Sequence, residues 1–170
     1  KLEKTLKAAG INVVYAVAGD CIKSGEFSVK CMHPCDGYDY ESANDYSAVY
    51  LVEYGDFSML MTGDAEKKAE KCIVEDVNRI AGDADTSARL VSVNILKVGH
   101  HGSKGASSEE FLSYIKPETA LISCGHPHTE TLKRLSGIKA KVYRTDESGE
   151  IAVRVREGSY KIEMFKELKG

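Results

Sequence analysis

The segment from Tyr46 to Asp64 constrains the fold more than any other part of the chain. Two β-forming runs flank a Gly55-Asp56 turn, which predicts a β-hairpin. The second run stops at Thr62-Gly63-Asp64, where a helical pattern begins. A strand that ends at a carboxylate presents it at the open edge of a sheet, so Asp64 is a candidate functional residue.

Histidines follow two later apolar runs, which cover residues 92–98 and 119–124. Four of the five histidines lie in the loops after these runs, namely His100, His101, His126 and His128. Because ligands of open α/β sheets gather at the carboxyl ends of strands, we expect Asp64 and these imidazoles to share one crevice. Carboxylates and neutral imidazoles both offer lone pairs to divalent metals, which predicts a metal site.

Helical and strand patterns alternate along the rest of the chain, which predicts an α/β fold with some antiparallel pairing. Helices are expected at 2–9, 65–77 and 129–135, and between the Ser107-Ser108 cap and Pro117; further strands are expected at 11–17, 27–32, 142–145 and 151–155. Residues 35–45 form an acidic, aromatic segment, for which a solvated loop is favoured over the rim of a site.

Length and composition fit one soluble domain. The chain has 170 residues, a formal net charge of -3 and 29% charged residues, and no apolar run approaches the ~18 residues of a membrane span. The total charge gives no sign of a basic surface that binds phosphate backbones, although bound metal ions would add positive charge. Composition therefore neither indicates nor excludes nucleic-acid binding.

The five cysteines are predicted to be free thiols. Their number is odd and no C-x-x-C spacing is present. The alternative is a zinc site that uses Cys31 and Cys35. His33, which precedes a proline at a strand end, is predicted to be structural.

An ordered set of motifs resembles the metallo-β-lactamase-like domain of the ComEC family, which takes part in DNA uptake during competence. The motifs are Asn44-Asp45-Tyr46-Ser47, Thr62-Gly63-Asp64, Leu96-Lys97-Val98-Gly99-His100-His101-Gly102-Ser103, Gly125-His126-Pro127 and Tyr143-Arg144-Thr145-Asp146-Glu147-Ser148-Gly149. The resemblance extends from about residue 11 to residue 156. It implies a four-layer αββα sandwich with metal ions at one edge.

The resemblance also implies roles for individual residues. Asp64 matches the acidic residue that bridges two metal ions, so Asp64, His126 and His101 are the expected ligands of Zn²⁺ or Mn²⁺. His100, His101 and Ser103 are the expected catalytic residues, which divide between metal binding and phosphate contact.

Two departures from the family pattern affect the expected domain. Residues 1–20 contain nothing like the family's His-x-His-x-Asp-His motif, and relatives carry a short Asn-containing segment where Gly125 here abuts His126. We therefore expect residues 1–170 to form a single metallo-β-lactamase-like domain that is incomplete at its N-terminus and lacks residues between 125 and 126.

The leading function is metal-dependent hydrolysis of phosphodiester bonds in single-stranded DNA without sequence preference. DNA and a divalent metal are the expected partners, with no membrane contact by this segment, and the family resemblance implies the extracellular or cell-surface side. The alternatives are hydrolysis of a lactone or thioester, an inactive interaction domain with a decayed metal site, and a receiver-type domain with Asp64 as phospho-acceptor.

Overall fold

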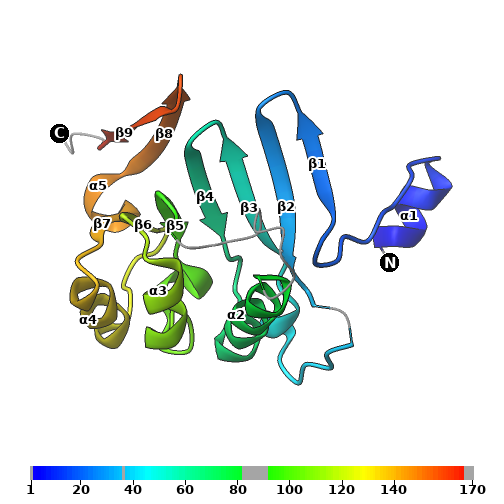
Figure 1. Ribbon diagram of the computed structural model, residues 1–170, viewed down its shortest axis with the longest axis horizontal. Helices are drawn as coiled ribbons and strands as arrows, with labels where there is room; N and C mark the ends of the chain where they lie inside the picture. The colour runs from blue at the N-terminus through cyan, green and yellow to red at the C-terminus, as the bar shows by residue number, and fades with distance from the viewer. Residues whose placement is uncertain (1, 36, 82–91, 167–170) are drawn as a thin grey trace.

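The computed structural model describes residues 2–35, 37–81 and 92–166. Its main sheet has seven strands that lie side by side in sequence order (Figure 1). They are β1 (Cys21–Ser24), β2 (Phe27–His33), β3 (Val49–Tyr54), β4 (Phe57–Met61), β5 (Ile95–Lys97), β6 (Thr119–Ile122) and β7 (Lys141–Arg144). Strands β1 to β4 pair antiparallel, and strands β4 to β7 pair parallel. The hairpin predicted around Gly55-Asp56 is β3–β4.

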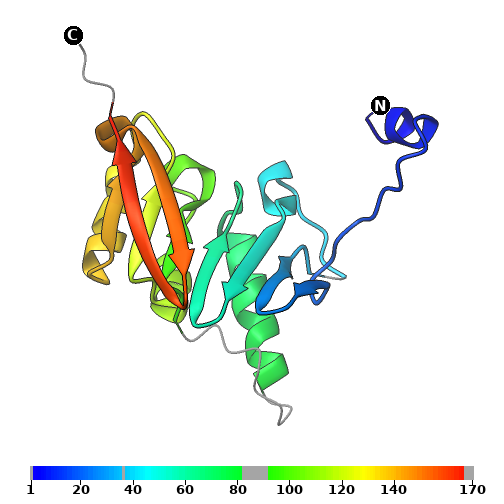
Figure 2. The same cartoon turned by 90° about the horizontal axis from the view of Figure 1, so that it is seen from above.

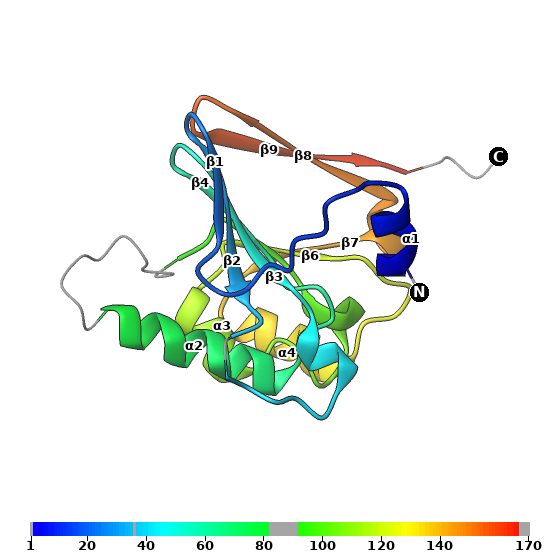
Figure 3. The same cartoon turned by 90° about the vertical axis from the view of Figure 1, so that its right-hand side faces the viewer.

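Helices cover one face of this sheet and a hairpin crosses part of the other (Figure 3). The covering helices are α2 (Lys67–Ala81), α3 (Glu109–Ile115) and α4 (Thr129–Gly137), and the hairpin consists of β8 (Glu150–Arg156) and β9 (Ser159–Phe165). Short helical turns are η1 (Ala43–Tyr46), η2 (Gly99–Gly102) and α5 (Thr145–Ser148). Helix α1 (Leu2–Ala8) lies apart from the sheet (Figure 2). None of the helices among the described residues is long and apolar enough to cross a membrane.

The main core lies between the sheet and its helices. Fully buried side chains from three parallel strands and three helices meet there: Leu60, Leu96, Ile122, Ile73, Phe111 and Leu135. Each such side chain contributes about 1.5–3 kcal/mol of transfer free energy. A smaller cluster on the opposite face joins Phe57, Ile95 and Leu121 to the β8–β9 hairpin. These layers confirm an α/β fold of the predicted type: one helix layer, one sheet and a two-stranded part of a second sheet.

The outer face of β1 to β4 is apolar and largely uncovered. Phe27 pairs with Tyr54, and Tyr54 pairs with Phe57, so these three side chains share that face. Phe57 is buried by the hairpin, whereas Phe27 is 40% exposed and Tyr54 is 37% exposed. On the same face Ile22 is 73% exposed. An apolar surface of this kind is typical of an interface.

Two expectations about local structure are wrong. Residues 11–17 form no strand but an irregular segment, with Val14 79% and Tyr15 68% exposed, because the described part of the chain offers them no strand to pair with. Cys35 and Cys72 are not free thiols but form a disulfide. A separation of 37 residues between a loop and a helix gives no sequence signal for such a bond. Cys21, Cys31 and Cys124 are free thiols, as predicted.

A buried carboxylate joins α2 to the start of α3. Glu70 is only 2% exposed, and its two oxygens accept hydrogen bonds from the backbone N–H groups of Ser107 and Ser108, the latter at 2.9 Å. Burial raises the pKa of Glu70, while the hydrogen bonds and Arg134 act in the opposite direction. The Ser108 side chain caps α3, as the sequence predicts.

Replacing Glu70 by glutamine should lower the free energy of unfolding by about 2–4 kcal/mol, because the amide N–H₂ would face a backbone donor instead of accepting from it. Urea denaturation of the wild type and variant measures this change. Glu75→Gln on the exposed face of α2 is the matched control, for which the change should stay within about 0.5 kcal/mol. Equal stability of the Glu70→Gln variant and the control would contradict the assigned contact.

Candidate functional site

The corner after β4 fixes the position of Asp64. Thr62 Oγ1 donates a hydrogen bond to the Lys97 carbonyl at 2.8 Å, and Asp64 N donates to Ser47 Oγ at 3.1 Å. Gly63 lies between them with a φ of 53°, and a Cβ there would lie 3.2 Å from Ser47 Cβ. Contacts from both sides of the strand therefore hold the corner, while the Asp64 side chain remains 48% exposed.

The loop after β5 carries two histidines in an unusual backbone conformation. His100 has φ 45° and ψ 47°, and His101 has φ 53° and ψ 27°. The left-handed region costs a residue other than glycine on the order of 1–3 kcal/mol. His100 N donates to the Gly63 carbonyl at 3.0 Å, and Ser103 N donates to the His100 carbonyl at 2.9 Å. The first of these bonds ties the loop to the Asp64 corner.

His101 and Asp64 present two acceptor atoms to each other. His101 Nδ1 lies 2.6 Å from the Ser123 carbonyl, which can only accept, so Nδ1 carries the hydrogen. In the neutral ring Nε2 then has a free lone pair, and it lies 4.0 Å from Asp64 Oδ1. Two such acceptors are stabilised by a cation or a proton between them. Ligands of one tetrahedral ion lie roughly 3.4 Å apart, so a small rotation would let this pair bind a divalent metal.

His100 points to a second carboxylate. Its Nδ1 lies 2.8 Å from Glu66 Oε1, and Asn44 Nδ2 lies 3.4 Å from the same nitrogen. Because a carboxylate only accepts, Nδ1 donates its hydrogen to Glu66. This contact orients the ring and leaves Nε2 as the basic atom, an arrangement that is typical of functional histidines.

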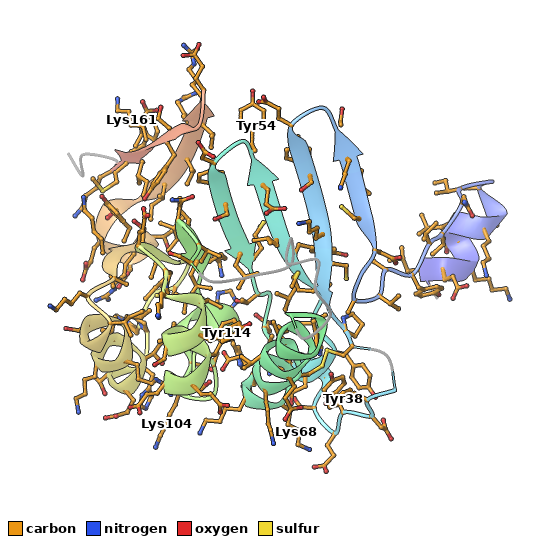
Figure 4. All side chains as sticks on the ribbon, viewed as in Figure 1. Tyr38, Tyr54, Lys68, Lys104, Tyr114 and Lys161 are labelled. Carbon is orange, nitrogen blue, oxygen red and sulfur yellow. A yellow bond between two sulfur atoms is a disulfide. The ribbon has the colours of Figure 1, made fainter. Side chains whose placement is uncertain are left out.

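An open depression of about 550 Å³ lies beside this pair of loops. Its lining includes every histidine of the candidate set together with neighbouring polar residues: His100, His101, Ser103, Lys104, Cys124, His126 and His128. His128 serves as the N-cap of α4, where its Nδ1 accepts from Glu130 N at 3.2 Å. Lys104 and Lys68 project from the same edge of the molecule (Figure 4). The depression thus combines imidazoles with a nearby positive charge.

Ser103 supplies an unpaired hydroxyl at this depression. Its Oγ is buried and has no hydrogen-bond partner. A buried hydroxyl without a partner costs about 1–3 kcal/mol, so it is a candidate for a ligand contact.

The predicted ligands come together only in part. Asp64 and His101 face each other, and His126 lines the same depression as His101. His126 also lies near Asp146, whose pKa is lowered by Arg144 and, to a smaller extent, by His126. Among the described residues, the one group of three or more His, Cys, Asp or Glu donors within 4.8 Å of one another is His33, Cys35 and Cys72. Asp64, His101 and His126 therefore supply two close donors and one more distant one.

Sequence reasoning missed two residues of the site. Glu66 lies two positions after Asp64 at the start of a helix, a spacing that could have marked it as a second carboxylate. Lys97 ends β5 and donates from Nζ to the Val98 carbonyl at 2.9 Å. Burial lowers the pKa of Lys97, while Asp64 raises it. No motif reveals the effect on Lys97, because that effect depends on burial.

Sequence comparisons relate the chain to proteins of the ComEC family. The chain is 34% identical over 165 residues to ComE operon protein 3 of Bacillus subtilis, and 37% identical over 116 residues to Recombination protein 2 of Haemophilus influenzae. These matches cover 92% and 65% of the chain. The chain is a ComEC-family homologue. Competence protein ComA of Neisseria gonorrhoeae, 29% identical over 79% of the chain, is a further relative. No protein-family model matches the chain.

The ComEC-family relatives are much longer than the matched segment. The chain spans 20%, 13% and 20% of the lengths of these three proteins. Among solved structures, the E377D mutant of the CmlA β-hydroxylase matches with a TM-score of 0.50 and 10% identity, over 85% of this chain and 34% of that one. This neighbour has the metallo-β-lactamase fold, which confirms the fold predicted from the resemblance.

Gly102→Ala should lower the free energy of unfolding by about 2–4 kcal/mol and disturb the loop that carries the histidines. Gly102 has a φ of 79°, and a Cβ there would lie 2.8 Å from Pro127 Cβ. Gly125→Ala in the same depression is the matched control, because a Cβ at Gly125 meets nothing within 4 Å. Urea denaturation distinguishes the two variants. If they were equally stable, the close packing of Gly102 against Pro127 would be wrong.

Proposed function

We propose that this ComEC homologue forms part of a divalent-metal-dependent hydrolase that cleaves phosphodiester bonds in single-stranded DNA. The observation that carries the proposal is the pair of acceptors Asp64 Oδ1 and His101 Nε2, which face each other across 4.0 Å at the carboxyl ends of β4 and β5. A bound divalent ion, Zn²⁺ or Mn²⁺, lowers the pKa of a water ligand and polarises a phosphoryl oxygen. The names of two relatives, Recombination protein 2 and Competence protein ComA, support DNA as the substrate.

Each residue of the site has a task in this proposal. Asp64 and His101 hold the metal, with His126 as the third ligand from the other loop. His100, which Glu66 orients through Nδ1, and Ser103, whose hydroxyl has no partner, contact the phosphate.

Electrostatics then favour weak, sequence-independent binding. Lys104 borders the depression, but the chain as a whole carries a net charge of -3. Affinity for a phosphate backbone should therefore be modest and should fall as salt is added. No base-reading motif is present in the sequence, so the proposed contacts are limited to phosphates.

We further propose that a bound metal takes ligands beyond Asp64 and His101. Two close donors leave a divalent metal short of the ligands that it binds in proteins, and residues 1–20 lack the family's His-x-His-x-Asp-His motif. The uncovered apolar face that includes Ile22, Phe27 and Tyr54 supports a further sheet packed on β1 to β4. The segment expected between Gly125 and His126 stays a prediction.

An interaction domain with a decayed metal site is the second candidate, and the small number of close donors among the described residues favours it. Elemental analysis after dialysis against Zn²⁺ or Mn²⁺ distinguishes the two candidates. The receiver-type alternative is wrong, because receiver domains have an all-parallel sheet and β1 to β4 here are antiparallel.

The protein expressed from its complete reading frame should cleave an end-labelled single-stranded oligonucleotide with Mn²⁺ or Zn²⁺ and stop when EDTA is added. Asp64→Asn should lower the rate by about 100-fold and weaken metal binding, because the amide is a poor ligand with the same shape. Asp56→Asn, at the other end of the same strand, is the matched control and should retain full activity.

Equal cleavage by the wild-type and Asp64→Asn proteins would assign the activity to a contaminant and contradict the proposed site. Absence of cleavage by a metal-loaded wild type would remove DNA as the substrate. A panel of lactones and thioesters, tested on the same preparation, would then separate another hydrolase from an inactive domain.

A further inference from the structure

A second group of metal-binding side chains lies away from the depression. His33 ends β2, Cys35 follows in the next loop, and Cys72 lies in α2. All three residues are buried, and their donor atoms lie within 4.8 Å of one another. Two sulfurs and an imidazole are a donor set that zinc favours.

The His33 ring is already oriented as metal-bound histidines are. Its Nδ1 lies 2.8 Å from the Ser47 carbonyl and must donate, since a carbonyl only accepts. Nε2 therefore carries the lone pair and accepts from Tyr40 OH at 2.8 Å. A backbone carbonyl on the far ring nitrogen is the usual outer-shell partner of a histidine ligand.

The spacing of the two cysteines suits both of their chemical states. In the disulfide their Cα atoms are 6.6 Å apart, near the upper end of the range of about 4.4–6.8 Å that disulfides adopt. Two thiolates that bind one tetrahedral ion at ~2.3 Å each lie roughly 3.75 Å apart, so reduction must let the two sulfurs separate by about 1.7 Å.

We propose that Cys35, Cys72 and His33 bind one zinc ion when the disulfide is reduced. In the reduction a dithiol reductant gives two electrons and two protons to the S–S bond, which yields two thiols, and the reductant becomes a disulfide. Zinc then replaces the two thiol protons, which pass to solvent, and takes the His33 Nε2 lone pair in place of the Tyr40 hydrogen bond. The Tyr40 oxygen or a water fills the fourth position.

The bond between Cys35 and Cys72 joins the loop after β2 to α2 both in the disulfide and in the proposed zinc site. Residues 37–46 connect the loop that contains Cys35 to the depression, where Asn44 approaches His100. At the start of α2, Asp45 Oδ1 accepts hydrogen bonds from Glu66 N at 3.3 Å and from Ala69 N at 3.4 Å. A bond between the loop and α2, either S–S or S–Zn–S, keeps this segment beside the helix. The zinc site is independent of the Asp64–His101 pair, because it shares no residue with it.

Cobalt titration of the full chain tests the proposal. The Asp64→Asn variant is used because its Asp64–His101 pair cannot contribute to metal binding. The protein is reduced with a phosphine, freed of reductant under nitrogen and titrated with Co²⁺. We expect one Co²⁺ per chain, with a thiolate-to-cobalt charge-transfer band and tetrahedral visible bands. One equivalent of Zn²⁺ should abolish these bands.

Cys72→Ser should remove the charge-transfer band or weaken cobalt binding by about 100-fold, and Cys35→Ser should do the same. Cys21→Ser, which changes an exposed free thiol, is the matched control and should leave the spectrum unchanged. Circular dichroism of each reduced variant verifies that it is folded. A folded, reduced parent without the band, an undiminished band in Cys72→Ser, or the same band before reduction would each overturn the proposal.

Discussion

Parallel pairing of β4 with β5 determines where the candidate site residues Asp64 and His101 lie. Their register places Leu60 beside Leu96 and Met61 beside Lys97. Asp64 follows the first strand by three residues, and His101 follows the second by four, so both leave the sheet at the same edge. The strands keep this register because Leu60 and Leu96 are both buried against the helices, and a shift by one residue would move them to the opposite face. Burial of apolar side chains thus sets the 4.0 Å approach of Asp64 to His101.

The start of α2 connects the edge that carries Asp64 and the histidines to the rest of the domain. Asp45 accepts hydrogen bonds from the first turn of this helix, Glu66 orients His100, and Glu70 holds the segment that leads into α3. Each of these carboxylates joins segments that are distant in sequence, and together they act where the positive end of the helix dipole favours negative charge. The disulfide of Cys72 adds a covalent link to the same helix. A displacement of α2 would therefore alter the position of the histidine loop through several contacts.

Sequence patterns predicted those features that depend on local chemistry. The Gly55-Asp56 hairpin, the Ser108 cap and the apolar strands that end at Asp64 and the histidines have signals within a few residues. The patterns failed where the outcome depends on a distant partner. Residues 11–17 are β-forming, yet a strand needs a neighbour; Cys35 and Cys72 pair only because the fold brings a loop to a helix. Glu66 was missed for the same reason, since its role comes from the ring it contacts across the fold.

The backbone of the histidine loop is unusual for residues that are not glycine. His100 and His101 both adopt left-handed conformations, which glycine would adopt at lower cost in free energy. The surrounding contacts hold the strained pair in place: His100 N bonds to the Gly63 carbonyl, and His101 Nδ1 bonds to the Ser123 carbonyl. Those bonds aim one imidazole at Glu66 and the other at Asp64, each with its second nitrogen left basic. Glycine would satisfy the turn but would lose the contacts of the two rings with Glu66 and with the Ser123 carbonyl.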